Sequence, residues 1–153
     1  MSQAAAAPLD PPLDAGARMS PTAIRLVRIW LLVVAAMVYA MILVGGATRL
    51  TDSGLSITEW RPLLGAIPPM NAADWEEAFA KYRTMTAQFH QVNPDMDMAG
   101  FQAIYWWEWA HRQLGRVIGL VFLIPFLAFL AARMIPSRLL PHLLALFALG
   151  GLQ

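Results

Sequence analysis

The sequence predicts an all-α integral membrane protein, a bundle of transmembrane helices, and three observations lead to that class. Of the 153 residues, 58% are hydrophobic and only 14% are charged, against about 45–50% and about 25% in soluble domains. The mean hydropathy is +0.52. Two apolar runs are long enough to cross a bilayer, and a Glu-x-x-His pair stands at the polar start of the second run. An ionisable pair at such a depth usually marks a site.

Several classes of function are excluded by what the sequence lacks. There is no basic run and no motif that reads DNA or RNA, so we expect no nucleic-acid partner. The chain has no cysteine, which excludes a disulfide, a thiolate metal site and a cysteine nucleophile. There is also no Gly-rich phosphate loop, no nucleophile elbow and no H-E-x-x-H zinc motif.

We divide the chain into a disordered cytoplasmic tail, residues 1–23, and an N-terminal membrane domain, residues 24–153. The tail is rich in alanine and proline, and its prolines disfavour any sustained helix. A first transmembrane helix is predicted at about residues 29–47, which carry no charge over 19 positions. A signal peptide is the competing interpretation, but the apolar run is too long and no cleavage signal follows.

A long polar loop is expected at about residues 48–100, because turn-forming residues are dense in its first half. Within the loop, the stretch after Asn71 predicts one amphipathic helix, with Asn71 as its N-cap. The apolar face of that helix suits either the membrane surface or a roof over the bundle. It consists of Trp75, Ala78, Phe79, Tyr82 and Met85.

The second transmembrane helix is predicted at about residues 101–134, with Asp97 as its cap. Tyr105, Trp106, Trp107 and Trp109 gather at its entry, as in an interfacial aromatic belt. Pro125 lies inside the apolar run, so we expect a kink and a neighbouring helix that covers the freed carbonyl group. A third apolar run starts at about residue 139, and its roughly 14 residues are too short to span. We therefore expect the chain to end inside a third membrane helix.

The distribution of charge predicts the orientation of these helices. Arginines flank the first helix at its start and the second at its end, whereas seven acidic residues lie in the long loop. The positive-inside rule then places the N-terminus in the cytoplasm and the long loop on the outer side. The flanking arginines are Arg18, Arg25, Arg28, Arg133 and Arg138.

Glu108 and His111 are the candidate site, because residues three apart on a helix share a face. A neutral imidazole such as His111 binds haem iron in many membrane bundles. Gly115 and Gly119 follow on deeper turns, where they leave room for a flat macrocycle or for a second helix. Arg112 and Arg116 are weaker candidates, as partners of haem propionates.

Each of these residues also has a structural interpretation. Glu108 can simply pair with Arg112 at i,i+4, and His111 can be an interfacial histidine that bonds to the loop. The glycine pair is more often a packing motif, and the aromatic cluster is more often a belt than a cofactor pocket. His90 is expected to be solvated and His142 to have a structural or interfacial role.

Two longer strings carry a resemblance to a known family. GGATRLTDSGLSITEWRPLLGAIPP (45–69), followed by IYWWEWAHRQLGR (104–116), closely resembles the heme A synthase family. The similarity is closest to its proteobacterial and mitochondrial branch. It is strong from about residue 45 to 119 and weak in the flanking helices. The family branch with a cysteine pair in the first outer loop is not matched.

The resemblance implies an eight-helix membrane protein of two four-helix halves, which oxidises a methyl group of heme O to the formyl group of heme A. It implies that His111 ligates haem iron in the substrate half and that Glu108 is catalytic. It also implies a heme b in the other half. The family's pattern continues well past Gln153, so its second haem ligand and the heme b ligands are missing here. A chain of 153 residues is therefore expected to be inactive alone, and to be an incomplete gene product or a fragment.

The partners implied are the lipid bilayer, heme O, the assembly of a terminal oxidase and, as a candidate, heme O synthase. We expect self-association and a multi-pass location in the bacterial inner membrane, with the long loop in the periplasm. Two rival functions stay open: a non-enzymatic b-type haem-binding electron carrier and an oxidase assembly factor. For Glu108 itself, the open roles are to accept a proton, to stabilise positive charge, or only to orient His111 or a propionate partner.

Overall fold

The computed structural model describes residues 20–59 and 64–152, and within these ranges the secondary structure is entirely helical. The described ranges contain two long helices, three shorter α-helices and one 3₁₀ turn. The expected all-α class is therefore confirmed. The elements are α1 (Pro21–Leu50), η1 (Leu64–Ala66), α2 (Ala72–Met85), α3 (Ala87–Gln91), α4 (Met98–Ala131) and α5 (Leu140–Leu152).

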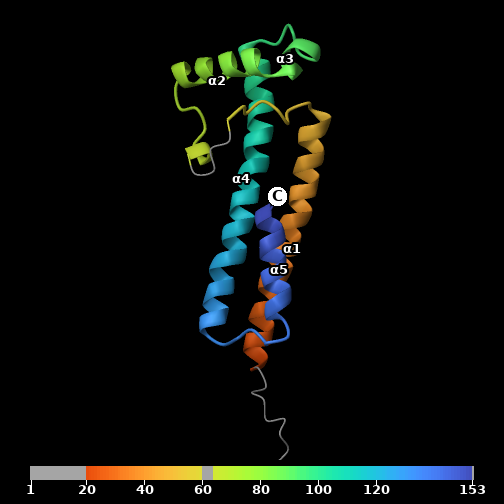
Figure 1. Cartoon of the computed structure of the whole chain (residues 1–153), viewed down its shortest axis with the longest axis vertical. Coiled ribbons are helices and arrows are strands. Elements are labelled where there is room, and N and C mark those ends of the chain that lie inside the picture. Colours follow the sequence, from red (N-terminus) through yellow and green to blue (C-terminus); the bar gives the residue numbers. More distant parts are fainter. Residues whose placement is uncertain (1–19, 60–63, 153) are drawn as a thin grey trace, which may run out of the picture.

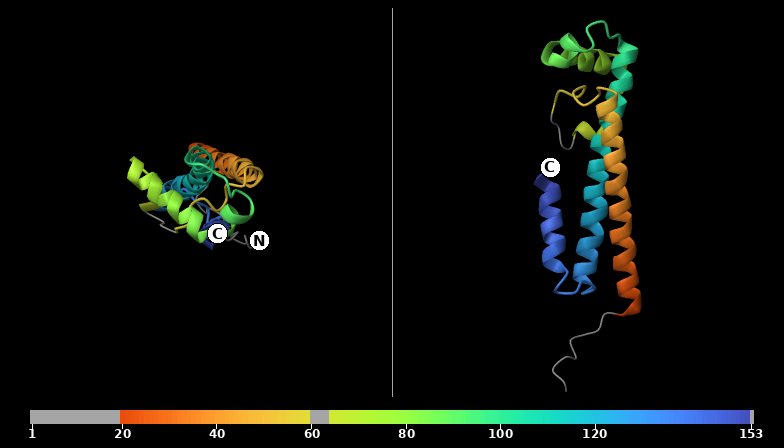
Figure 2. Two further views of the ribbon diagram at one scale, coloured as in Figure 1. Left: turned by 90° about the horizontal axis from the view of Figure 1, so that it is seen from above. Right: turned by 90° about the vertical axis from the view of Figure 1, so that its right-hand side faces the viewer.

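The two long helices, α1 and α4, lie side by side and antiparallel along the length of the molecule (Figure 1). After α4 the chain turns back, and α5 runs alongside the half of α4 that is far from the loop (Figure 2). Both long helices are apolar enough to cross a membrane, and only 11% of the residues in each apolar window are buried. A core helix of a soluble protein would be mostly buried, so these exposed apolar surfaces fit contact with lipid.

Helix α1 begins inside the stretch that we assigned to the tail, and Pro21 is its first residue. Proline is well accommodated there, because the first helical N–H groups have no intrahelical partner and the fixed φ of proline already suits a helix. The hydroxyl of Ser20 caps the helix by accepting a bond from the Ala23 N–H, at 3.1 Å. The expectation that the prolines of residues 1–23 disfavour any sustained helix is therefore wrong at Pro21, and residues 1–19 of the predicted tail lie outside the described residues.

Both long helices end in a Schellman motif that sequence patterns did not predict. After α1, Asp52 has a φ of 49°, and after α4, Arg133 has a φ of 54°. In each case the next residue donates its N–H to a carbonyl five positions back: Ser53 to Thr48 at 2.9 Å, and Met134 to Phe129 at 2.8 Å. These bonds satisfy carbonyl groups that a helix end leaves unpaired.

A hydrogen bond between helices compensates for the proline inside α4. Pro125 has no N–H group, so the carbonyl of Val121 has no partner within the helix. The indole Nε1 of Trp30 on α1 donates to that carbonyl at 2.8 Å. The prediction that a neighbouring helix covers the freed carbonyl is confirmed.

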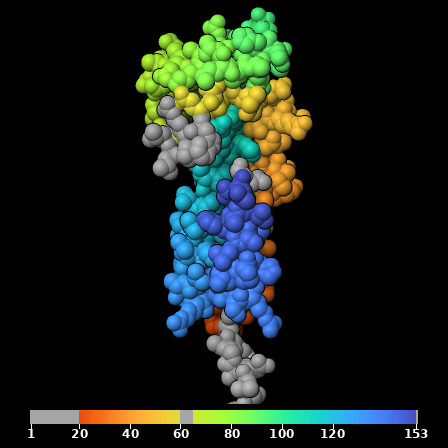
Figure 3. All heavy atoms as spheres, viewed as in Figure 1, coloured from red at the N-terminus to blue at the C-terminus, as the bar shows by residue number. Residues whose placement is uncertain are grey.

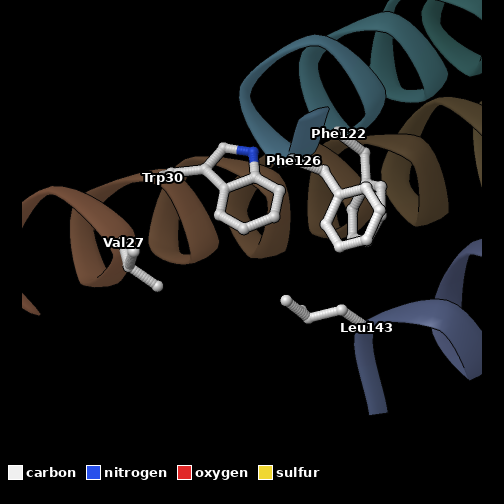
Figure 4. Packing of buried hydrophobic residues seen from close by; sticks show 5 residues of the cluster. All are labelled: Val27, Trp30, Phe122, Phe126 and Leu143. Carbon is white, nitrogen blue, oxygen red and sulfur yellow. The ribbon is translucent and has the colours of Figure 1, made fainter. Parts of the chain in front are cut away.

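Trp30 is also the centre of the apolar core between the helices. Its ring centroid lies 5.2 Å from that of Phe122 and 5.5 Å from that of Phe129. Figure 4 shows the buried side chains of this cluster, to which α1, α4 and α5 all contribute. They are Val27, Trp30, Phe122, Phe126 and Leu143.

A second, aromatic cluster joins α2 and α3 to the first turns of α4, so these two helices roof the loop end of the bundle (Figure 3). The predicted N-caps are confirmed: Asn71 caps α2 and Asp97 caps α4. Met85 was expected on the buried face of α2 but is 67% exposed, because it is the last residue of the helix. The buried members are Tyr82, Phe89, Phe101, Ile104 and Tyr105.

The bond between Trp30 and Val121 generates a prediction about stability. Trp30→Phe keeps an aromatic ring but leaves the Val121 carbonyl unpaired, which should destabilise the chain by about 1–3 kcal/mol. In a Pro125→Ala background the restored N–H pairs with Val121, so the same substitution should be about 1 kcal/mol milder. Unfolding in mixed detergent micelles, followed by circular dichroism, measures both. Equal losses in the two backgrounds would contradict this account.

Candidate functional site

Glu108 is a buried carboxylate on α4, and only 4% of its surface is exposed. Its Oε2 accepts hydrogen bonds from the hydroxyl of Ser56 at 2.7 Å and from the N–H of Ile57 at 2.9 Å. Its Oε1 accepts from two nitrogens of Arg112, Nη2 at 2.6 Å and Nε at 3.0 Å. The sequence-predicted i,i+4 pair is therefore present, within a larger node of hydrogen bonds.

This node fits an ionised carboxylate. A carboxylate offers roughly four lone-pair positions, and four donors already point at the oxygens of Glu108. A proton on Oε1 would face the guanidinium of Arg112, whereas for a proton on Oε2 the Ser56 hydroxyl can accept if its own hydrogen turns to the carbonyl of Ser53, at 3.2 Å, or of Ile104, at 3.4 Å. Glu108 is thus arranged as a fixed negative charge whose neighbours hold it in one orientation.

Arg112 connects the same node to the loop backbone. Besides its bonds to Glu108, Nη2 donates to the carbonyl of Ile57 at 2.9 Å and Nη1 donates to that of Glu59 at 3.3 Å. These contacts use four of the five N–H donors that a guanidinium carries. Arg112 therefore mainly links α4 to the loop segment 56–59 by hydrogen bonds.

The buried polar residues of the described ranges are all members of one hydrogen-bonded chain. They are Thr48, Ser53, Ser56 and Glu108, each at most 6% exposed. The carbonyl of Thr48 accepts bonds from the N–H and the hydroxyl of Ser53, both at 2.9 Å. The N–H of Ser56 reaches the Ser53 carbonyl at 3.5 Å, and the Ser56 hydroxyl reaches Glu108. This polar chain ties the end of α1 to α4.

His111 lies one turn beyond Glu108, on the side of α4 that faces α1. A Cβ atom added to Gly45 would lie 3.0 Å from its Nε2, 3.6 Å from Cδ2 and 3.7 Å from Cε1. The ring therefore presents Nε2 to the backbone of α1. Within the described ranges, no hydrogen bond to the ring is formed, and no cluster of three or more potential metal ligands occurs.

The other predicted residues are spread along the structure rather than gathered here. Gly115 packs closely against α1, because a Cβ there would lie 3.0 Å from Met41 Cε, whereas Gly119 has nothing within 4 Å. Arg116 donates from Nη1 to Gln113 Oε1 at 2.9 Å. His90 is exposed on α3, and His142 Nδ1 lies 3.0 Å from the carbonyl of Arg138.

The node also borders a cavity of about 330 Å³ between the loop, α2 and α4. Ser56, Ile57 and Arg112 form part of its wall, and Lys81 bridges Glu59 at 2.7 Å and Glu77 at 2.5 Å. These two hydrogen bonds raise the pKa of Lys81 above its usual 10.5. The bridge is therefore complete at neutral pH and is lost only as the pH rises through that raised value.

The sequence analysis identified the site residues on α4 but not the residues of α1 and the loop that contact them. Glu108, His111 and Arg112 were identified because charged residues are rare at the start of a membrane helix. Small residues such as Gly45 and Ser56 carry no such signal, since loops and helix ends contain many of them. The only local sign was the density of hydroxyl residues after α1.

The fold and this node together define an integral membrane helix bundle with a polar site at the loop end of its helices. A sequence profile of cytochrome oxidase assembly proteins matches residues 28–153, and the chain belongs to that family. No solved structure matches the chain.

Curated relatives named heme A synthase are similar over most of the chain. The protein from Cereibacter sphaeroides is 62% identical over 127 residues, which is 83% of this chain and 32% of the relative. That from Caulobacter vibrioides is 58% identical over 84% of this chain and 37% of the relative. The protein from Paracoccus denitrificans is 59% identical over 92% of this chain and 36% of the relative. The chain thus spans about a third of the length of these relatives.

The node predicts that Glu108 keeps the loop on α4. Glu108→Ala leaves the Ser56 hydroxyl, the Ile57 N–H and Arg112 without their acceptor, so the loop should open more often. We expect the Ile57 amide to exchange its hydrogen at least about tenfold faster, equivalent to roughly 1.4 kcal/mol. Hydrogen exchange in detergent micelles measures this.

Glu76→Ala is the matched control, because Glu76 is an exposed carboxylate on α2. It should leave the exchange of the Ile57 amide unchanged. Equal exchange rates in the two variants would mean that Glu108 does not hold the loop.

Proposed function

We propose that this chain contributes the haem-substrate site of a heme A synthase, which oxidises a methyl group of heme O to the formyl group of heme A. The observation that carries the proposal is the pairing of a buried, fully hydrogen-bonded Glu108 with an imidazole, His111, one turn away on the same helix. Similarity of about 60% to proteins named heme A synthase supports it. The activity belongs to the whole protein of such a family, and these residues would supply one part of it.

His111 is the residue that would hold haem iron. Among the residues that the structure describes, neither ring nitrogen forms a hydrogen bond. Gly45 presents no side chain to Nε2, and a Cβ there would lie only 3.0 Å from that nitrogen. A histidine between close-packed apolar helices, with glycine beside it, is chemically suited to a planar haem. Bound haem would supply the redox chemistry, and the iron–imidazole bond would fix the macrocycle.

Glu108 is proposed to act as a fixed charge rather than as a proton acceptor. Oxidising a methyl carbon withdraws electrons from it, so positive charge develops at the edge of the macrocycle. A carboxylate that is already oriented stabilises such charge without rearranging at the moment of reaction. Because four donors occupy its oxygens, taking up a proton would require at least one of these bonds to be given up, most simply by rotation of the Ser56 hydroxyl toward the Ser53 or Ile104 carbonyl.

The arginines are proposed to have different roles. Arg112 is largely committed to Glu108 and the loop, which favours a positioning role over contact with a propionate. Arg116 remains the candidate for a haem propionate, since a guanidinium suits carboxylate geometry. The ligands of a heme b are proposed to lie in residues beyond those of this chain, in the part of the relatives that it does not cover.

The proposed setting is the inner membrane of a bacterium, with a multi-pass topology and a cytoplasmic N-terminus. The arginines at the far ends of α1 and α4, against the acidic loop, support a periplasmic node. Heme O reaches the site from heme O synthase as the proposed donor, and the product serves assembly of a terminal oxidase. Self-association of the chain is part of the same proposal.

The test uses cells that make heme O but lack their own heme A synthase. They receive the complete reading frame, or its His111→Ala or Glu108→Ala variant, and extracted haems are identified by mass. The parent should yield heme A, and either variant should lower the yield at least about a hundredfold.

The same experiment separates the enzyme from its rivals. An electron carrier would accumulate heme b with no heme A in the parent, and an assembly factor without haem would leave the pigment unchanged in His111→Ala. If Glu108→Ala formed as much heme A as the parent, the proposed charge-stabilising role would be refuted.

A further inference from the structure

Among residues 20–59 and 64–152, no hydrogen bond sets the direction in which the His111 ring points. Histidines that bind metals are usually oriented by a partner on their other ring nitrogen, which fixes the tautomer and the tilt of the ring. Within the described ranges the ring of His111 has no such partner. Steric contacts must therefore orient it, and the contact at its Nε2 atom comes from α1.

That contact is made by Gly45. A Cβ built on Gly45 would be 3.0 Å from Nε2, at the limit that real Cβ atoms show. Its distances to Cδ2 and Cε1, 3.6 and 3.7 Å, are nearly equal, so the added atom would sit over the nitrogen itself. A metal–imidazole bond is only about 2 Å long, and any side chain here would crowd the position from which Nε2 binds.

The end of α1, about one turn beyond Gly45, is tied to α4, whereas the bond at Gly45 itself lies within α1. The carbonyl of Gly45 accepts a bond from the Thr48 hydroxyl at 2.8 Å. Thr48 is the first member of the polar chain that runs through Ser53 and Ser56 to Glu108, all of them buried. The same node that holds Glu108 therefore fixes α1 against α4 at the level of His111.

We propose that Gly45 is a positioning residue for His111: its missing side chain lets α1 approach Nε2 and so sets the direction in which the imidazole can bind haem iron. This inference rests on the proposed haem role of His111. Its steric part, the contact between Gly45 and the ring, is independent of any ligand and can be tested without one.

The next residue along the chain provides a matched control. Gly46 lies in the same helix, and a Cβ added there meets nothing within 4 Å. Gly→Ala raises helix propensity by about 1 kcal/mol at either position. A difference between Gly45→Ala and Gly46→Ala therefore reports on the contact with His111 and not on the helix.

The first measurement is made on the haem-free chain. It contains only three histidines, His90, His111 and His142, so histidine-labelled protein in micelles gives three resolvable sets of ring signals. In the parent, the ring protons of His111 should show nuclear Overhauser contacts to the Gly45 Hα atoms. Gly45→Ala should shift the His111 ring signals alone, and Gly46→Ala should shift none. Unchanged signals of His90 and His142 verify that the variants fold.

The second measurement is a titration with ferric haem b, followed by absorbance. Gly45→Ala should weaken binding at least about fivefold and change the absorption spectrum, Gly46→Ala should stay within about twofold, and His111→Ala should abolish binding. Missing Overhauser contacts in the parent, or identical His111 signals and affinities in the two alanine variants, would overturn the role of Gly45. Full haem affinity in His111→Ala would instead overturn the proposed function, while the ring signals still decide the contact.

Discussion

The structure depends on one constraint: a polar group that lies among apolar helices must find a partner, because neither lipid nor the core provides one. Two groups create the largest demand. One is the carbonyl of Val121, freed by Pro125, and the other is the carboxylate of Glu108. Each is satisfied from a distant part of the chain, by Trp30 in the first case and by the loop after α1 in the second. These bonds fix α1 on α4 near both ends.

The second of these demands also builds the site. A carboxylate at 4% exposure is costly to bury unless several donors surround it. The donors here are the hydroxyl of Ser56, the N–H of Ile57 and the guanidinium of Arg112. To deliver them, the loop must cross α4 beside Glu108, and the end of α1 must follow. The charge, the loop and the helix end are therefore a single unit, and His111 lies one turn away from it.

The two residues of the Glu-x-x-His pair are held in different ways. The oxygens of Glu108 accept four hydrogen bonds from the protein. The ring of His111 instead packs against α1, and among the described residues its nitrogens form no hydrogen bond. In the proposed function, the first would supply a fixed charge and the second a ligand. The roof of aromatic side chains on α2 and α3 covers the same end of the bundle.

Local patterns were enough to predict the class, the helices and the positions that needed explanation. The apolar runs predicted α1 and α4, the side chains of Asn71 and Asp97 predicted two caps, and Pro125 predicted an unpaired carbonyl. These features depend on hydrophobicity, on i,i+3 spacing and on the chemistry of one residue, all of which are written in neighbouring positions. Pro21 shows the limit, because the same proline breaks a helix in its middle and begins one at its first turn.

The identity of the partners was decided by long-range packing. Trp30 reaches Val121 across 91 positions, and Ser56 reaches Glu108 across 52. Gly45 meets His111 only because α1 and α4 lie antiparallel at one particular register. No periodicity in the sequence encodes that register, since small residues and hydroxyl groups occur throughout such segments. The sequence therefore shows which groups require a partner, and the register of the two long helices determines which residues provide one.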